Sequence, residues 1–93
     1  MPVVRVATTQ FAAKGDDVSR NVAAAETLVR EAAADGANIV LIQELFAGRY
    51  FCQEQRAEHF GRAFSADPRE NPLLCHFATL AKELSVALPM SFF

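Results

Sequence analysis

We predict an α/β fold in which strands and helices alternate in the order β-α-β-α-β along the 93 residues. Apolar residues recur at every third or fourth position in two segments, which is the pattern of one buried helix face. Three short segments rich in apolar and β-branched residues precede, separate and follow these two helices. Elements in this order form a parallel sheet with right-handed crossovers. A chain of this length holds one domain at most.

The first strand is predicted over residues 3–9, where Val4 and Val6 alternate with Arg5. A turn, FAAKGDD, follows it and leads into the first helix.

That helix is predicted over residues 18–35. The two aspartates before it suit its start, because carboxylates favour the positive end of the helix dipole. Glu26 can pair with Arg30 one turn later, and Gly36 stands where a left-handed cap is wanted. The predicted buried stripe consists of Val18, Val22, Ala25, Val29 and Ala32.

The run ANIVLI, residues 37–42, predicts a second strand that is buried on both faces, as in parallel sheets. Residues 46–69 form a longer irregular stretch, with a short helix predicted around residues 55–62. The stretch is longer than a connection needs, and such loops usually carry function.

The second helix is predicted to begin with Asn71 as its cap and Pro72 at its first position, and to end near Ser85. Its predicted buried face consists of Leu74, Phe77, Ala81 and Leu84. Residues 86–93 are predicted to be extended, and Pro89 favours an edge position or a bulge. Two helices cannot easily cover both faces of a three-stranded sheet, so we expect an incomplete domain.

The composition excludes several classes of function. Nine Lys and Arg stand against eleven Asp and Glu, so no basic field exists to attract nucleic acid or anionic lipid. No apolar run approaches the roughly 18 residues of a membrane span, and no signal-peptide core is visible. Two cysteines make no disulfide scaffold and fit a reducing compartment, so a cytoplasmic location is expected.

Glu44 is the principal candidate for chemistry. It follows directly on the apolar run IVLI and Gln43, and ligands of open α/β sheets collect at the carboxyl ends of the strands. Partial desolvation there would raise the pKa of the carboxyl toward the working range of a general base. The alternative is a solvated or helix-capping glutamate in the next turn.

The two cysteines are interpreted as structural. Cys52 lies eight positions after Glu44, but packing beside Phe51 is favoured over a role as nucleophile. Cys75 falls in the first turn of the second helix, where a buried packing role is favoured over a thiol activated by the helix dipole.

The remaining candidates are interpreted as surface residues. Lys14 is expected in a loop at the same edge of the sheet as Glu44, and both Lys14 and Lys82 are read as solvated. His59 and His76 share no ligand spacing with a cysteine, so no metal site is predicted.

Four segments carry a resemblance to a known family: ATTQF (7–11), GANIVLIQELF (36–46), GRYFCQ (48–53) and HFATLAKELSVALPMSFF (76–93). They resemble the amino-terminal third of the nitrilase, or carbon–nitrogen hydrolase, superfamily, and the likeness covers nearly the whole chain. QELF, YFCQ and LAKEL…LPMSFF are most similar to the branch that acts on N-carbamoylputrescine.

The resemblance implies that residues 1–93 are the amino-terminal segment of one domain, a four-layer α-β-β-α sandwich. It implies a Glu–Lys–Cys amidohydrolase without a metal or organic cofactor, in which Glu44 matches the general base. The family's lysine and cysteine lie on later strands, beyond residue 93, so this chain alone is expected to be inactive.

The resemblance further implies a small linear amide or carbamoyl amine as substrate. For the named branch, hydrolysis of N-carbamoylputrescine gives putrescine, carbon dioxide and ammonia, a step of polyamine synthesis. Self-association, or a need for the missing carboxyl-terminal portion, is also expected. By analogy Tyr50 and Phe51 line the substrate pocket; for Tyr50 this and simple loop packing stay open, and for Phe51 packing is favoured.

Two other functions are weighed. A non-catalytic interaction module would dock a partner through its uncovered sheet face and its alanine-rich first helix. A nucleotide-binding domain has less support, because neither GxGxxG nor GxxxxGK[ST] occurs.

Overall fold

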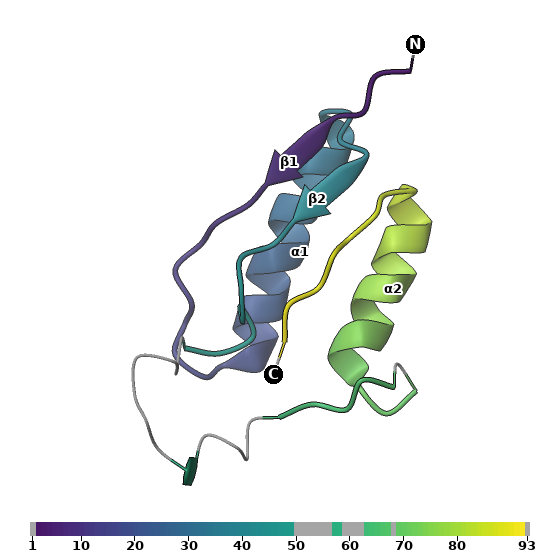
Figure 1. Cartoon of the computed structure of the whole chain (residues 1–93). Coiled ribbons are helices and arrows are strands. Elements are labelled where there is room, and N and C mark those ends of the chain that lie inside the picture. The colour runs from purple at the N-terminus through teal and green to yellow at the C-terminus, as the bar shows by residue number, and fades with distance from the viewer. Residues whose placement is uncertain (1, 50–56, 59–62, 68, 93) are drawn as a thin grey trace.

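The computed structural model describes residues 2–49, 57–58, 63–67 and 69–92. Its elements follow the predicted α/β order, with two helices and two short strands (Figure 1). They are β1 (Val6–Thr8), α1 (Val18–Ala34), β2 (Ile39–Leu41) and α2 (Pro72–Leu84). Of the short helix predicted around residues 55–62, all but residues 57–58 lies outside the described residues.

β1 and β2 are parallel neighbours, as predicted, with Val6 beside Ile39 and Thr8 beside Leu41. Pairing continues past the strand ends, because the Thr9 N–H donates to the Leu41 carbonyl at 2.8 Å. The carboxyl ends of both strands therefore lie at the same edge of the sheet.

The predicted third strand is reduced to one parallel bridge between Ala87 and Ile39. The Ala87 N–H donates to the Asn38 carbonyl at 2.9 Å, and the Val40 N–H donates to the Ala87 carbonyl at 3.0 Å. In a parallel ladder the next donor toward β2 belongs to residue 89, which is proline and has no N–H. The segment thus runs beside β2 (Figure 1) without extending the ladder.

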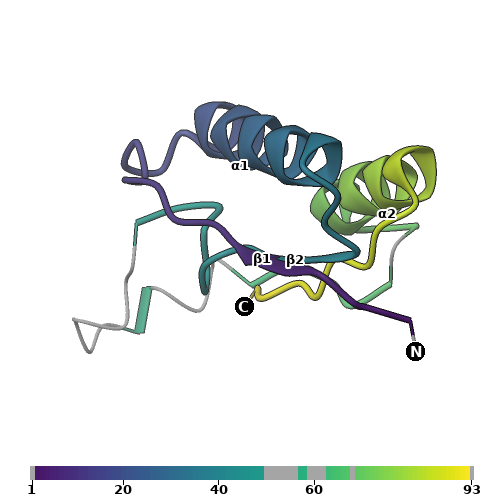
Figure 2. The same ribbon diagram turned by 90° about the horizontal axis from the view of Figure 1, so that it is seen from above.

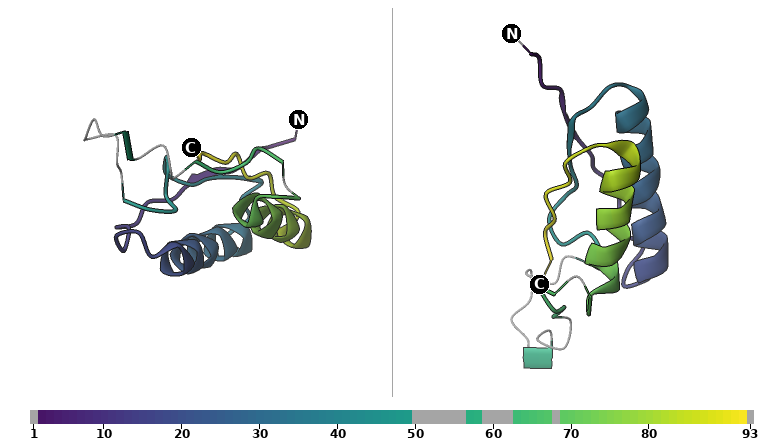
Figure 3. Two further views of the ribbon diagram at one scale, coloured as in Figure 1. Left: turned by 90° about the horizontal axis from the view of Figure 1, so that it is seen from below. Right: turned by 90° about the vertical axis from the view of Figure 1, so that its right-hand side faces the viewer.

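Both helices lie on the same side of the sheet (Figures 2 and 3). Val40 faces them and is fully buried, whereas Leu41 on the other face is 39% exposed. The prediction that residues 37–42 are buried on both faces is therefore wrong for this chain, because none of the described elements covers the second face.

The core lies between the helices and the sheet, and Phe46 is at its centre. The Phe46 ring meets Phe77 of α2 edge-on at a centroid distance of 5.5 Å and Phe11 at 6.3 Å. Such edge-to-face pairs stabilise a core beyond the area they bury. The other buried apolar residues of this cluster are Ala25, Val29, Val40, Ile42, Leu73 and Leu80.

The predicted ends of α1 are confirmed. Asp17 caps the helix and accepts a hydrogen bond from the Arg20 N–H, and Gly36 after the helix has a φ of 92°. The predicted stripe is correct at Ala25 and Val29 and wrong at Val18, which is 42% exposed. The buried position near the start of the helix belongs instead to Asn21.

The predicted ends of α2 are also confirmed. The Asn71 side chain accepts hydrogen bonds from two backbone N–H groups of the first turn, Pro72 follows it, and Ser85 closes the helix with a φ of 54°. The buried face is rotated from the predicted one. Leu73, Phe77 and Leu80 are buried, whereas Leu74, Ala81 and Leu84 are half-buried.

Candidate active site

Glu44 lies in the turn that leaves β2, at the carboxyl end of the parallel strand pair. This is the edge of the sheet where the loops of an α/β protein diverge and ligands bind. The sequence predicts Glu44 at this edge, and the structure has it in the turn directly after β2.

The environment of Glu44 differs from the predicted one. In the described chain this residue is exposed, so the partial burial expected of a general base is not met here. The core residues on either side of it, Ile42 and Phe46, are buried, whereas Glu44 itself is not.

Gln43, directly before Glu44, makes two hydrogen bonds that sequence reasoning missed. Its Oε1 accepts the Phe11 N–H at 2.8 Å, and its Nε2 donates to the Phe11 carbonyl at 2.6 Å. The side-chain amide thus pairs with the backbone of the segment that continues β1. A glutamine that immediately follows a buried strand was the available signal, but its partner 32 residues away could not be read from the sequence.

The residues directly after Glu44 are also fixed. Leu45 has a φ of 52°, a left-handed conformation that is rare for a residue other than glycine. Its N–H donates to the Ser91 Oγ at 3.3 Å, and the Phe46 ring that follows is buried in the core. Unfavourable backbone conformations persist where the surrounding structure over-determines them, and they cluster at functional sites.

Asn21 of α1 secures the far end of the same turn. It is fully buried, its Nδ2 donates to the Ala47 carbonyl at 2.9 Å, and its Oδ1 accepts the Lys14 N–H at 2.7 Å. It therefore joins the turn after β2 to the turn before α1. A polar residue in register with Ala25 and Val29 was the sequence signal for a buried, bonded asparagine.

The other candidates divide as follows. Lys14 and Lys82 are exposed, in agreement with their interpretation as solvated lysines. Cys75 is exposed on α2, so the predicted buried packing role is wrong; the rotation that buries Leu73 and Phe77 turns position 75 outward. Tyr50, Phe51, Cys52 and His59 lie outside the described residues.

His76 belongs to a charged cluster that joins the two helices. Its Nε2 lies 2.6 Å from the Glu26 Oε1, and Arg30 binds both Glu26, at 2.9 Å, and Glu83 of α2. Hydrogen bonds from Arg30 and then from His76 lower the pKa of Glu26, and Arg30 lowers the pKa of Glu83. This cluster joins α1 to α2.

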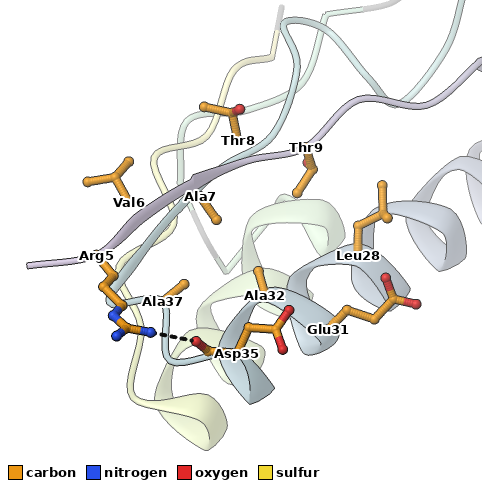
Figure 4. A pocket seen from close by; sticks show the side chains of 10 residues that line it. All are labelled: Arg5, Val6, Ala7, Thr8, Thr9, Leu28, Glu31, Ala32, Asp35 and Ala37. Atoms are coloured by element: carbon orange, nitrogen blue, oxygen red, sulfur yellow. Dashed lines mark hydrogen bonds between the residues drawn. The ribbon is translucent and has the colours of Figure 1, made fainter.

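A hollow of about 360 Å³ lies between β1 and the second half of α1 (Figure 4). Its lining includes Arg5, Thr8, Glu31 and Asp35, and the Arg5 Nη1 donates to the Asp35 carbonyl at 3.3 Å. Its lining residues come from β1, α1 and the connection to β2, so the hollow is separate from the turn of Glu44.

Two further findings concern the described part of the chain. Within those ranges, no three His, Cys, Asp or Glu side chains are grouped closely enough to hold a metal ion. Neither described helix is long and apolar enough to cross a membrane.

The arrangement places Glu44 on the turn after β2, at the edge of the parallel sheet where the loops diverge. The turn around it is fixed by the Gln43 amide before it and by the Leu45 and Phe46 contacts after it. A carboxylate held in this way can accept and return a proton, which is the chemistry of a general base.

Comparison with known proteins gives a family match over residues 5–93, to the carbon–nitrogen hydrolase model. The chain is 58% identical over 91 residues to a protein of Arabidopsis thaliana named N-carbamoylputrescine amidase. It is 54% identical over 90 residues to the rice protein of the same name. A citrullinase of Francisella tularensis is 34% identical over 93 residues.

These matches cover nearly the whole chain but a small part of each relative. The aligned region is 97% of this chain and 29% of the Arabidopsis protein, and 100% of this chain and 32% of the citrullinase. The chain therefore spans about three tenths of the length of these relatives.

Proposed function

The chain belongs to the carbon–nitrogen hydrolase family, and from this membership we propose that residues 1–93 are the amino-terminal part of one amidohydrolase domain. The domain hydrolyses a linear carbon–nitrogen bond in a carbamoyl amine, and its substrate is N-carbamoylputrescine. Glu44 is its general base. The lysine and cysteine that complete the triad come from a carboxyl-terminal portion of the kind that the relatives possess.

The observation that carries this proposal is the placement of Glu44. It follows β2 at the carboxyl end of the strands, on a turn whose backbone is fixed on both sides. Enzymes need such fixed placement, because a misplacement of about 1 Å can cost a factor of about 100 in rate.

In the proposed reaction Glu44 takes the proton of the cysteine thiol as the sulfur attacks the carbamoyl carbon. The lysine stabilises the oxyanion of the tetrahedral intermediate. Glu44 then gives the proton to the departing nitrogen, and ammonia leaves. Glu44 next activates the water that hydrolyses the S–C bond, and the carbamic acid that results decomposes to putrescine and carbon dioxide.

The exposure of Glu44 in this chain also enters the proposal. A general base works best with a pKa near the working pH, and burial raises the pKa of a carboxyl. We propose that the carboxyl-terminal portion covers Glu44 and supplies this burial. Tyr50, which lies outside the described residues, remains a predicted substrate contact.

The names of the relatives support the substrate class. N-carbamoylputrescine and citrulline both have a ureido group at one end of an alkyl chain and an ammonium group at the other, where citrulline has an additional carboxylate. The higher identity to the N-carbamoylputrescine amidases favours the diamine derivative. Homo-oligomer formation and a cytoplasmic location complete the proposal, the latter because two cysteines suit a reducing compartment.

The test joins residues 1–93 to the carboxyl-terminal part of the Arabidopsis relative, beginning where the alignment ends. We expect this joined protein to release ammonia from N-carbamoylputrescine, and to do so faster than from citrulline. Glu44→Gln is expected to lower kcat by about 100-fold or more, because general-base catalysis contributes about 10²–10⁴-fold.

Glu31→Gln is the matched control, since it neutralises another exposed glutamate, on α1. We expect it to leave kcat unchanged and both variants to fold, as circular dichroism would report. A folded joined protein that hydrolyses neither substrate would refute the proposed reaction. Full activity in the Glu44→Gln variant would refute the role of Glu44 alone.

A further inference from the structure

The side chain of Gln43 substitutes for backbone pairing where the two strands separate. Just beyond the strand ends, the Thr9 N–H donates to the Leu41 carbonyl at 2.8 Å. Two residues later on each strand, the Gln43 amide accepts from the Phe11 N–H and donates to the Phe11 carbonyl. A side-chain amide has the same donor and acceptor as a peptide group. The backbone at Gln43 can therefore turn away from the segment after β1, while the Gln43 side chain stays hydrogen-bonded to that segment.

Glu44 is exposed and lies on the turn that leaves β2. The position from which its side chain projects is set by the backbone on each side of it. On the following side, Leu45 is held in its left-handed conformation by the Ser91 contact and by the buried Phe46 ring. On the preceding side, the two half-buried hydrogen bonds of Gln43 hold the backbone against Phe11.

We propose that Gln43 is a positioning residue for Glu44. The inference rests on the proposed function, since it assigns Gln43 a role in that reaction. Gln43 acts through the backbone: its amide fixes the point at which the chain leaves β2, and so fixes the backbone position from which the next side chain projects.

The test uses the joined protein described above and the variant Gln43→Met, which keeps the side-chain length and removes both hydrogen bonds. We expect kcat for N-carbamoylputrescine to fall by about 10–100-fold, the scale of a sub-ångström to 1 Å misplacement. KM is expected to change by less than about 3-fold, because a displaced general base impairs the chemical step rather than uniform binding.

Asn38→Leu is the matched control. The Asn38 Oδ1 accepts the Arg5 N–H at 2.9 Å, so it also joins the same two strands by a side chain, but at the end far from Glu44. We expect Asn38→Leu to lower the unfolding midpoint and to leave kcat unchanged.

Gln43→Glu gives a second readout. A carboxylate accepts from the Phe11 N–H but cannot donate to the Phe11 carbonyl, whereas a protonated carboxyl does both. We therefore expect the kcat of Gln43→Glu, relative to that of the unmodified protein, to rise as the pH is lowered through the pKa of the new carboxyl. This comparison also serves if Gln43→Met does not fold.

The outcomes are distinct. An unchanged kcat in folded Gln43→Met, or equal losses of kcat in Gln43→Met and Asn38→Leu, would show that Gln43 is merely structural and overturn the inference while the proposed function stands. An unmodified joined protein that is folded and inactive would overturn both.

Discussion

At the scale of single residues, two buried asparagines hydrogen-bond the backbone of neighbouring segments. Asn21 and Asn71 are both buried, and each bonds backbone groups that would otherwise lack a partner at a helix end or a turn. The energetic reason is asymmetric: a bonded polar group adds little net stability, but leaving its partners unsatisfied costs about 1–3 kcal/mol. Such residues are therefore more sensitive to substitution than their polarity suggests.

Asn71→Ala is expected to lower the free energy of unfolding by about 1–3 kcal/mol. The substitution removes the cap on the Leu73 and Leu74 N–H groups and the 2.8 Å bond from the Asn71 Nδ2 to the Ser65 carbonyl. Urea unfolding followed by circular dichroism measures this loss of unfolding free energy.

Asp17→Ala is the control, because Asp17 caps α1 with one bond to the Arg20 N–H and is exposed. It is expected to cost about 0.5–1 kcal/mol. Equal losses in the two variants would contradict the extra role assigned to the buried asparagine.

At the scale of elements, two kinds of contact hold α1 and α2 together. Phe77 and Leu80 of α2 pack in the same core as Val29 of α1, and this burial supplies most of the stabilisation. The second contact is the exposed cluster in which Arg30 binds Glu26 and Glu83. Exposed ion pairs contribute little, but this cluster joins residues 53 positions apart and makes stability depend on pH.

The pH dependence has a definite sign. The pKa values of Glu26 and Glu83 are lowered from the ordinary value of 4.5 by hydrogen bonds from Arg30. A carboxyl with a lowered pKa in the folded state stabilises it above its unfolded pKa, and this contribution is lost as the pH falls through the folded pKa. We expect the thermal midpoint of unfolding to decrease as the pH is lowered below about 5, and to decrease less in Arg30→Met.

Differential scanning calorimetry at several pH values checks this expectation. Arg5→Met is the control, because the Arg5 Nη1 donates to a backbone carbonyl, that of Asp35; we expect its pH profile to parallel that of the unmodified chain. A pH profile of Arg30→Met that parallels that of the unmodified chain would show that the cluster does not link protonation to stability.

At the scale of the whole molecule, both helices cover one face of the sheet, and none of the described elements covers the other (Figure 2). Val4 and Val6 are 60% and 57% exposed, and Leu41 is 39% exposed. β1 is also the edge of the described sheet, and an exposed apolar edge strand favours association. In the proposed four-layer sandwich, the second sheet would pack against this face.

Residues 1–93 by themselves are therefore expected to self-associate and to bind an apolar dye. Val4→Lys with Val6→Lys should weaken both effects, whereas Val18→Lys, at an exposed valine on α1, should leave them. Sedimentation velocity over a range of concentrations measures the association. A monomeric chain that binds no dye would favour the non-catalytic interaction module over the proposed partial domain.

Much of the fold could be predicted from local signals. Asp17 and Asn71 mark helix starts, Gly36 follows the end of α1, and the Glu26–Arg30 pair has helical spacing. These predictions succeeded because capping and one-turn pairing depend on residues within four positions of each other. The position of Glu44 after a strand was predictable for the same reason.

Other features could not be predicted in this way. Periodicity gives the spacing of a helix face but fixes its rotation only approximately, so Leu80 was missed and Cys75 was assigned to the core. The two hydrogen bonds between the Gln43 side chain and the Phe11 backbone join residues 32 positions apart, and no local rule predicts that pair.

The amino-acid sequence by itself determined the element order, the helix ends, the parallel class of the sheet and the resemblance to a hydrolase family. Only the tertiary structure decided that both helices share one face, that Leu41 and Glu44 are exposed, and that Gln43 holds the turn before the candidate base. The physical reason is the sequence separation of the residues involved. Caps and helix periodicity depend on residues a few positions apart, whereas burial depends on which distant segments pack against each other.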